Sequence, residues 1–226
     1  MPPFPPVPQA HGLTSKTFTF PPLDGTLTLP EIFDFAAEHS SNHTVFLYPN
    51  DDDTVEHVNY TQVVRGIQRV GRVLSGLNLP PPAPGKTIAI FAQLETISYF
   101  TLIHGIIRAG YVPFPLSPRN SAAAVAHLLL KTRSEHLFVS SDALMQKVAA
   151  DAISLLHADP AVDLTVTCHL PPVFDELYAP LERDDHFDFP PAPKPDLGEV
   201  ALYLHSSGTM LPTSDLYFMA TDMHMP

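Results

Sequence analysis

Apolar residues recur along the chain at two spacings, and the alternation of these spacings predicts a series of strands and helices. Short continuous apolar runs bounded by turn residues favour buried strands, whereas apolar residues three or four positions apart favour helices. We predict strands over 43–48, 56–59, 86–91, 111–116, 136–140, 162–167 and 199–204. We predict helices from Thr28–Pro30 onward, from Thr61 to the prolines at 80–82, over 95–109, from Asn120 to Lys131 and over 142–157.

Strands that alternate with helices of this length predict an α/β fold, with a mainly parallel sheet covered by helices on both faces. Pro113 and Pro115 interrupt the strand over 111–116, which places this strand at the margin of the sheet. Asn120 is predicted to cap the helix that follows it. The helix over 142–157 is predicted to direct five residues mainly inward: Leu144, Val148, Ile153, Leu155 and Leu156. Three arginines of the helix after Thr61 are predicted to lie on its solvated face: Arg65, Arg69 and Arg72.

The 26 prolines cluster between the predicted elements and suggest how the chain is divided. Residues 1–27 are predicted to form a Pro-rich irregular leader, in which a flexible segment is favoured over a Pro-x-x-Pro ligand for an aromatic groove. Residues 28–209 are predicted to form one α/β domain, within which 171–195 is a Pro- and acid-rich connection. The remaining residues, 210–226, form a divergent tail.

Charge and cysteine content exclude several classes of function. The chain has 24 acidic and 12 basic residues, and a net charge of −12 argues against nucleic acid or an anionic membrane as a partner. No apolar stretch approaches the roughly 20 residues of a membrane span, and the N-terminus does not resemble a signal peptide, so a cytoplasmic protein is predicted. The single cysteine, Cys168, excludes an internal disulfide and a Cys-rich zinc site, and we predict that its thiol is buried or half-buried.

The most informative segment is the strand-like run Val200–His205 together with the residues that follow it. Ser206, Ser207, Gly208 and Thr209 form a polar turn whose backbone N–H groups and hydroxyls suit a phosphate. Ligands of parallel sheets bind beyond the carboxyl ends of the strands, which is where this turn is expected. A phosphate loop usually needs a cation as well, but the last basic residue of the chain, Lys194, precedes the turn.

Three segments resemble adenylate-forming enzymes, the superfamily that includes acyl-CoA synthetases, luciferases and the adenylation domains of peptide synthetases. The run Arg108–Pro118 is similar to the family's aliphatic-Ala-Gly-x-x-x-Pro-Leu-x-Pro segment. Val58–Gln62 resembles its early Thr/Ser-Tyr segment, and Leu202–Thr209 resembles the start of its phosphate loop. The three occur in the family's order over about 28–209, and the form of Ile106–Phe114 is most similar to fungal peptide-synthetase-like carboxylate reductases.

This resemblance implies a reaction. In the family, a carboxylic acid attacks the α-phosphorus of ATP with Mg²⁺ present, pyrophosphate leaves, and the acyl-adenylate passes its acyl group to the thiol of CoA or of a carrier protein. It implies cofactor-binding roles for Ser206, Ser207, Gly208 and Thr209, and a carrier-protein domain in a longer form of the chain. It assigns no catalytic residue and no metal ligand here.

The sequence departs from the family after Thr209. The family loop continues Thr-Gly-x-Pro-Lys, but here Met210 and Leu211 follow, and Thr213 or Ser214 stands where the Lys is expected. The adenine and magnesium contacts, the ribose Asp and the lid domain with its catalytic Lys are also missing from the sequence. An apolar face left uncovered by this incompleteness is expected to make the isolated chain poorly soluble.

Several functions remain to be weighed. We favour an incomplete adenylate-forming module without catalysis of its own. The alternatives are a nucleotide- or acyl-binding regulatory module and, least favoured, a complete ligase. A serine hydrolase is disfavoured because no Gly-x-Ser-x-Gly surrounds Ser206 or Ser207. A soft metal site in the tail is disfavoured against unselected sequence; its ligands would be Met219, Met223, His224 and Met225.

Overall fold

The computed structural model describes residues 15–22, 24–49, 54–180 and 199–205, and the backbone of 216–220. The chain divides into two compact units, residues 1–65 and 66–226. We describe each unit by itself.

The first unit contains a helix, a hairpin and the first turns of a second helix. Its elements are α1 (Leu29–His39), β1 (Thr44–Pro49), β2 (Val55–Asn59) and the start of α2 (Tyr60–Ser75). Thr28 and Glu31 form the capping box that starts α1. β1 and β2 pair in antiparallel fashion. Part of the predicted leader packs on this unit, because the ring of Phe18 stacks 6.1 Å from that of Tyr60.

The second unit is built on a four-stranded parallel sheet of β3 (Thr87–Phe91), β4 (Val112–Pro115), β5 (His136–Val139) and β6 (Thr167–His169), in the strand order β4-β3-β5-β6. Pro113 and Pro115 lie in β4, which is an edge strand as predicted. From β3 onward, the elements follow one another in alternation along the chain. They are β3, α3 (Thr96–Arg108), β4, α4 (Ala122–Thr132), β5, α5 (Ala143–Ala158), β6, α6 (Phe174–Tyr178), β7 (Val200–His205) and β8 (Leu216–Ala220).

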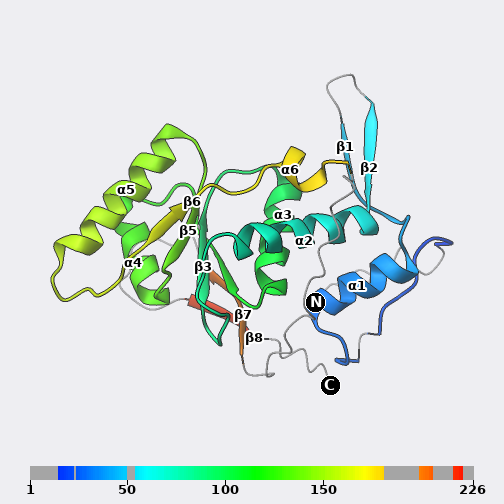
Figure 1. Cartoon of the computed structure of the whole chain (residues 1–226), viewed down its shortest axis with the longest axis horizontal. Coiled ribbons are helices and arrows are strands. Elements are labelled where there is room, and N and C mark those ends of the chain that lie inside the picture. Colours follow the sequence, from blue (N-terminus) through cyan, green and yellow to red (C-terminus); the bar gives the residue numbers. More distant parts are fainter. Residues whose placement is uncertain (1–14, 23, 50–53, 181–198, 206–215, 221–226) are drawn as a thin grey trace, which may run out of the picture. The chain divides into compact units, whose positions relative to one another are not determined.

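Helices cover both faces of this sheet (Figure 1). Every residue of β3 is buried, and its side chains alternate between two cores. Ala89 and Phe91 pack with α4 and α5, whereas Ile88 and Ile90 pack with α3 and the second half of α2. The prediction of an α/β fold with a parallel sheet and helices on both faces is therefore confirmed.

The N-cap of α4 and part of the inward face of α5 differ from the predictions. Ser121, not Asn120, caps α4, since its hydroxyl accepts a hydrogen bond from the Ala124 N–H. In α5 the prediction is confirmed for Leu156, which is buried, and for Val148 and Ile153, which are partly buried against the core. It is wrong for Leu144 and Leu155, which are 69% and 49% exposed. The inward face of α5 is the row at three- and four-residue spacing that starts one residue later: Met145, Ala149, Ala152 and Leu156. Sequence pattern had favoured the leucines because they are larger, but small alanines allow α5 to pack closely.

The predicted connection 171–195 contains a short helix, α6, which the sequence analysis missed. α6 is held by Arg69, whose Nη1 donates to the carbonyl oxygens of Leu177 at 3.0 Å and Ala179 at 2.8 Å. The prediction that this arginine lies on a solvated face was therefore wrong. Tyr178 adds a second anchor by donating to Thr101 Oγ1 at 2.6 Å, because the Thr101 hydroxyl itself donates to the Ile97 carbonyl.

The predicted strand over 162–167 begins later than expected. Only 167–169 pair with β5, forming the edge strand β6.

Burial raises the pKa of Tyr178, the residue that anchors α6, to about 12. Its hydroxyl is consequently a neutral donor throughout the physiological pH range.

Candidate functional site

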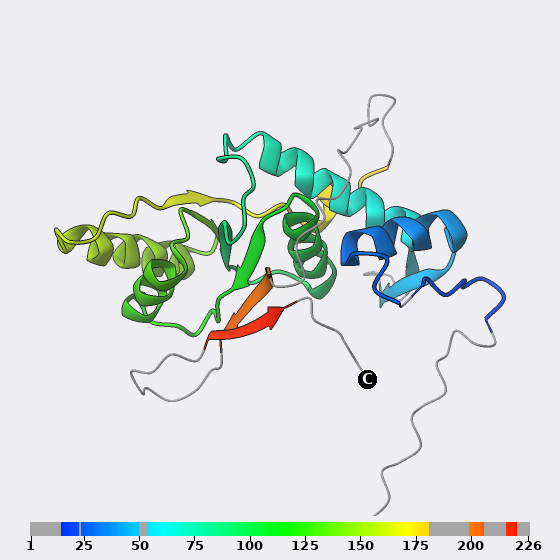
Figure 2. The ribbon, with the colours of Figure 1, turned by 90° about the horizontal axis from the view of Figure 1, so that it is seen from below.

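The predicted phosphate turn follows directly from β7. β7 ends at His205, and the four predicted site residues, Ser206, Ser207, Gly208 and Thr209, lie outside the described residues. β7 pairs in antiparallel fashion with β8, which falls in the predicted divergent tail (Figure 2). Of the metal ligands considered for that tail, Met219 is a backbone position of β8, and the others lie outside the described residues.

His205 connects the end of β7 to a turn more than eighty residues earlier in the chain. The backbone N–H of Ser117 donates to His205 Nε2 at 3.0 Å. Because Nε2 is the acceptor, the neutral imidazole carries its proton on Nδ1 when this bond is formed. The bond fixes the residue immediately before the phosphate turn against the segment that follows β4.

Aromatic packing supports the same junction. Phe114 of β4 is fully buried, and its ring lies edge-on to those of Tyr203, at a centroid distance of 5.8 Å, and His205, at 6.0 Å. The carboxyl ends of β4 and β7 therefore lie together, where open α/β sheets place their ligands.

The turn over 117–121 presents hydrogen-bond donors and a positive charge at this junction. Arg119 is exposed, and its guanidinium has no hydrogen bond or ion pair with any residue that the structure describes. Asn120 Nδ2 is buried and likewise has no acceptor among the described residues. Donors without acceptors suit the oxygens of an anion.

Arg119 was not predicted as a site residue, because the cation of a phosphate loop was expected after the turn and not earlier in the chain. The signal was nonetheless present. Arg119 lies in a polar turn at the carboxyl end of a predicted strand, which is where ligand contacts gather in this class of fold.

The histidines and the cysteine do not form a metal centre in the described part of the chain, where no group of three or more His, Cys, Asp or Glu is placed to hold an ion. His136 Nδ1 and His169 Nε2 lie 3.0 Å apart, and burial lowers the pKa of both rings, so the pair is neutral near pH 7. Cys168 is exposed rather than buried or half-buried as predicted. Partial desolvation raises the pKa of its thiol, which disfavours a reactive thiolate.

Comparison with known families identifies the fold. The sequence matches the AMP-binding enzyme family over residues 33–210, which is most of the chain. It is 36% identical over 214 residues to adenylate-forming reductase Nps10 of Heterobasidion annosum, covering 92% of this chain and 19% of that protein. It is 40% identical over 200 residues to adenylate-forming reductase Nps11 of Serpula lacrymans, covering 86% of this chain and 18% of that protein. The chain therefore belongs to the AMP-binding enzyme family.

Solved structures support the same fold. A fatty acyl-CoA synthetase of Mycobacterium tuberculosis superposes with a TM-score of 0.55 at 18% identity, covering 79% of this chain and 32% of that one. VinN superposes with a TM-score of 0.57 at 16% identity, covering 80% of this chain and 42% of that one. The chain spans about a fifth of the length of the two adenylate-forming reductases. It thus corresponds to a part of an adenylate-forming protein.

The family generally uses ATP and Mg²⁺ and acts on carboxylic acids. The described residues fit the first of these in part, because the exposed guanidinium of Arg119 is suited to phosphate oxygens. Among the described residues, no group of three or more His, Cys, Asp or Glu is placed to hold the ion by protein ligands alone. None of the helices in the described ranges is both long and apolar enough to cross a membrane.

Proposed function

We propose that this chain carries the nucleotide-phosphate part of an adenylate-forming domain and binds ATP without forming an acyl-adenylate by itself. Ser206, Ser207, Gly208 and Thr209 would cradle the phosphates, and Arg119 would supply the cation. The observation that supports the proposal is the hydrogen bond from the Ser117 N–H to His205, because it joins the residue before the predicted phosphate turn to the turn that holds Arg119.

Chain geometry supports this assignment. Ser206 directly follows His205, and Arg119 lies two residues after Ser117. Because consecutive Cα atoms are about 3.8 Å apart, neither Ser206 nor Arg119 can lie far from the hydrogen bond that joins His205 to Ser117. An extended arginine side chain is long enough to bridge such a separation. Its guanidinium also binds phosphate oxygens in a bidentate fashion, which a lysine cannot do. Arg119 is therefore a suitable substitute for the Lys that the family places at the end of its loop.

The absence of catalysis follows from what the family's chemistry requires. Charge neutralisation and positioning lower the barrier to attack on a phosphorus atom, and most of the groups that perform them are missing from this sequence. Adenylation of a carboxylic acid and transfer to CoA or a carrier-protein domain are, in our proposal, activities of a longer protein that contains this segment. Any ligand bound by the chain alone would therefore be released unchanged.

Replacing Arg119 by Gln is expected to weaken the binding of ATP and of inorganic pyrophosphate by about tenfold, since a charged hydrogen bond contributes about 1.5 kcal/mol. Isothermal titration of the full chain measures both ligands. Lys131→Gln is the matched control, because it removes the same charge from an exposed position of α4 and should change either affinity by less than about twofold.

Titrations of the unmodified chain and of Arg119→Gln distinguish failure of the nucleotide-binding proposal from failure of the role given to Arg119. If the unmodified chain binds neither ATP nor pyrophosphate, the nucleotide-binding proposal is wrong. If it binds them and Arg119→Gln binds equally well, only the role of Arg119 is wrong.

A further inference from the structure

The order in which the chain adds strands to the parallel sheet reverses between the neighbouring strands β3 and β5, since β3 is followed by β4 on one side and β5 by β6 on the other. β3 leads into α3 on one face, and β5 leads into α5 on the opposite face. In an open parallel sheet such a reversal leaves a crevice at the carboxyl ends of the two strands, and ligands of α/β proteins bind in it. This position differs from the junction of β4 and β7, so it is a second place to look for a ligand.

A cavity of about 470 Å³ lies at this reversal. Gln93 and Leu94 line it after β3, and Ser140 and Ser141 line it after β5. The Ser140 hydroxyl joins the two loops, because its Oγ accepts from the Gln93 N–H at 2.6 Å and donates to the Gln93 carbonyl at 3.3 Å. The volume is in the range of small-molecule sites, which is about 300–1,000 Å³.

The segment from β6 to α6 forms a further wall of the cavity. Leu170 and Val173 line it although they are 63% and 50% exposed, and Glu176 lines it from α6. Such exposed apolar side chains beside a cavity gain from being covered by an apolar ligand. The wall is held in place by the anchors of α6 on Arg69 and Thr101.

The charge of the cavity selects the kind of ligand. Among the described residues that line the cavity, Glu176 is the only charged one. Two helices, α3 and α5, also begin at this edge, but two N-terminal amides of each already donate to the carboxylates of Glu95 and Asp142. These carboxylates and Glu176 place negative charge at this edge, which disfavours an anion.

The hydrogen-bonding groups of the cavity also favour a ligand that carries a hydrogen-bond donor. Glu176 Oε2 accepts from the Val173 N–H at 3.0 Å, which leaves most of the acceptor capacity of its carboxylate. The side chains of Gln93 and Ser141 are exposed and make no hydrogen bond within the described ranges. The cavity thus combines apolar walls with one carboxylate and two neutral polar groups.

We propose that this cavity binds a small organic amine, in which a protonated nitrogen contacts Glu176 and an apolar body lies against Leu94, Leu170 and Val173. The inference does not rest on ATP binding or on the phosphate turn. It depends only on described residues in the loops that follow β3, β5 and β6 and in α6.

Three probes of equal size test the charge preference: hexylamine, hexanol and hexanoate, each titrated into the full chain at pH 7 and followed by amide chemical shifts. Hexylamine is expected to bind about tenfold more tightly than hexanol, and hexanoate is expected to bind more weakly than hexanol, because a charge-assisted hydrogen bond contributes roughly 1.5 kcal/mol. The shifts are expected at Gln93, Ser141 and Glu176. Absence of binding, equal binding of the three probes, or shifts elsewhere would overturn the proposal.

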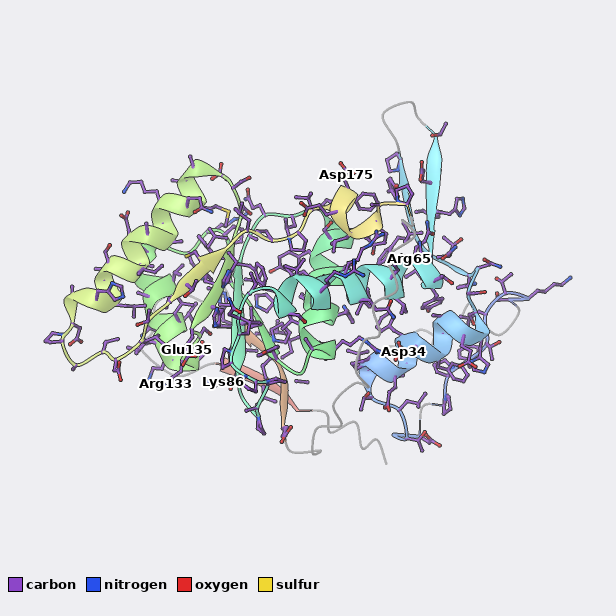
Figure 3. The ribbon with its side chains drawn as sticks, viewed as in Figure 1. Asp34, Arg65, Lys86, Arg133, Glu135 and Asp175 are labelled. Carbon is purple, nitrogen blue, oxygen red and sulfur yellow. The ribbon has the colours of Figure 1, made fainter. Side chains whose placement is uncertain are left out.

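Glu176→Gln tests the assigned contact. The amide oxygen of Gln can still accept from the Val173 N–H, so α6 keeps its cap while the charge is lost. Hexylamine affinity is expected to fall about tenfold, to that of hexanol. The control is Asp175→Asn on the same helix (Figure 3), because Asp175 is exposed and does not line the cavity. An equal loss in both variants, or none in Glu176→Gln, would show that Glu176 does not hold the amine.

Discussion

Phe114→Ala is expected to lower the free energy of unfolding of the second unit by about 3–5 kcal/mol, the usual range for removing a fully buried aromatic ring. Phe114 is 0% exposed and belongs to the core beneath α4 and α5. Its ring also contacts Tyr203 and His205, so its removal takes away the packing that brings β7 to β4. The loss therefore affects both the stability of the sheet and the entrance to the phosphate turn.

Urea unfolding of the full chain measures this effect, and Phe114→Leu provides the graded control. Leu keeps most of the buried apolar volume, so a loss of about 1–1.5 kcal/mol is expected from it. Slowed exchange of the Ser117 amide reports on its hydrogen bond to His205, and this protection should decrease in Phe114→Ala. A loss of stability below about 1 kcal/mol in Phe114→Ala would contradict the burial of this ring.

Gly105→Ala is expected to destabilise the second unit by about 2–3 kcal/mol. In an exposed helix interior, the same substitution instead stabilises a protein by about 1 kcal/mol. Gly105 lies in the last turn of α3, and a Cβ added there would overlap Cβ and Cγ1 of Val70 on α2. The close approach of α2 and α3 at this point leaves no room for a methyl group. The sign of the change distinguishes packing from helix propensity.

The double variant Gly105→Ala with Val70→Ala should recover part of the loss, because it removes the side chain that the new methyl group meets. Gly76→Ala is the control glycine: an added Cβ there meets only ordinary contacts, so a change within about 0.5 kcal/mol is expected. Thermal unfolding of the unmodified chain, Gly105→Ala, Val70→Ala and the double variant gives the coupling between positions 70 and 105. A stabilised Gly105→Ala variant would mean that α2 and α3 are not packed as closely as described.

The sequence predicted the fold where local pattern decides structure. The continuous apolar run over 87–91 and the prolines at 113 and 115 were enough to predict a buried strand and an edge strand. The three motif segments also predicted the family that the comparisons confirm.

Features that depend on distant contacts were not predictable in this way. α6 has only five residues between proline-rich segments and owes its place to Arg69, more than a hundred residues earlier. The junction of Ser117 with His205 is equally remote in the chain, and without it Arg119 has no connection to the phosphate turn. Periodicity carries no information on such pairings, because each partner satisfies its local pattern alone.

The measurement that tests the account most directly is carboxylate-dependent exchange of pyrophosphate into ATP, performed on a sample of the full chain already shown by titration to bind ATP. Exchange requires formation of an acyl-adenylate and its reversal, so it reports on catalysis rather than on binding. We predict saturable ATP binding with no exchange above the protein-free background for any carboxylic acid tested. Exchange that depends on an added acid would contradict the proposal, because it would show that this segment activates a carboxylate without the groups missing from its sequence.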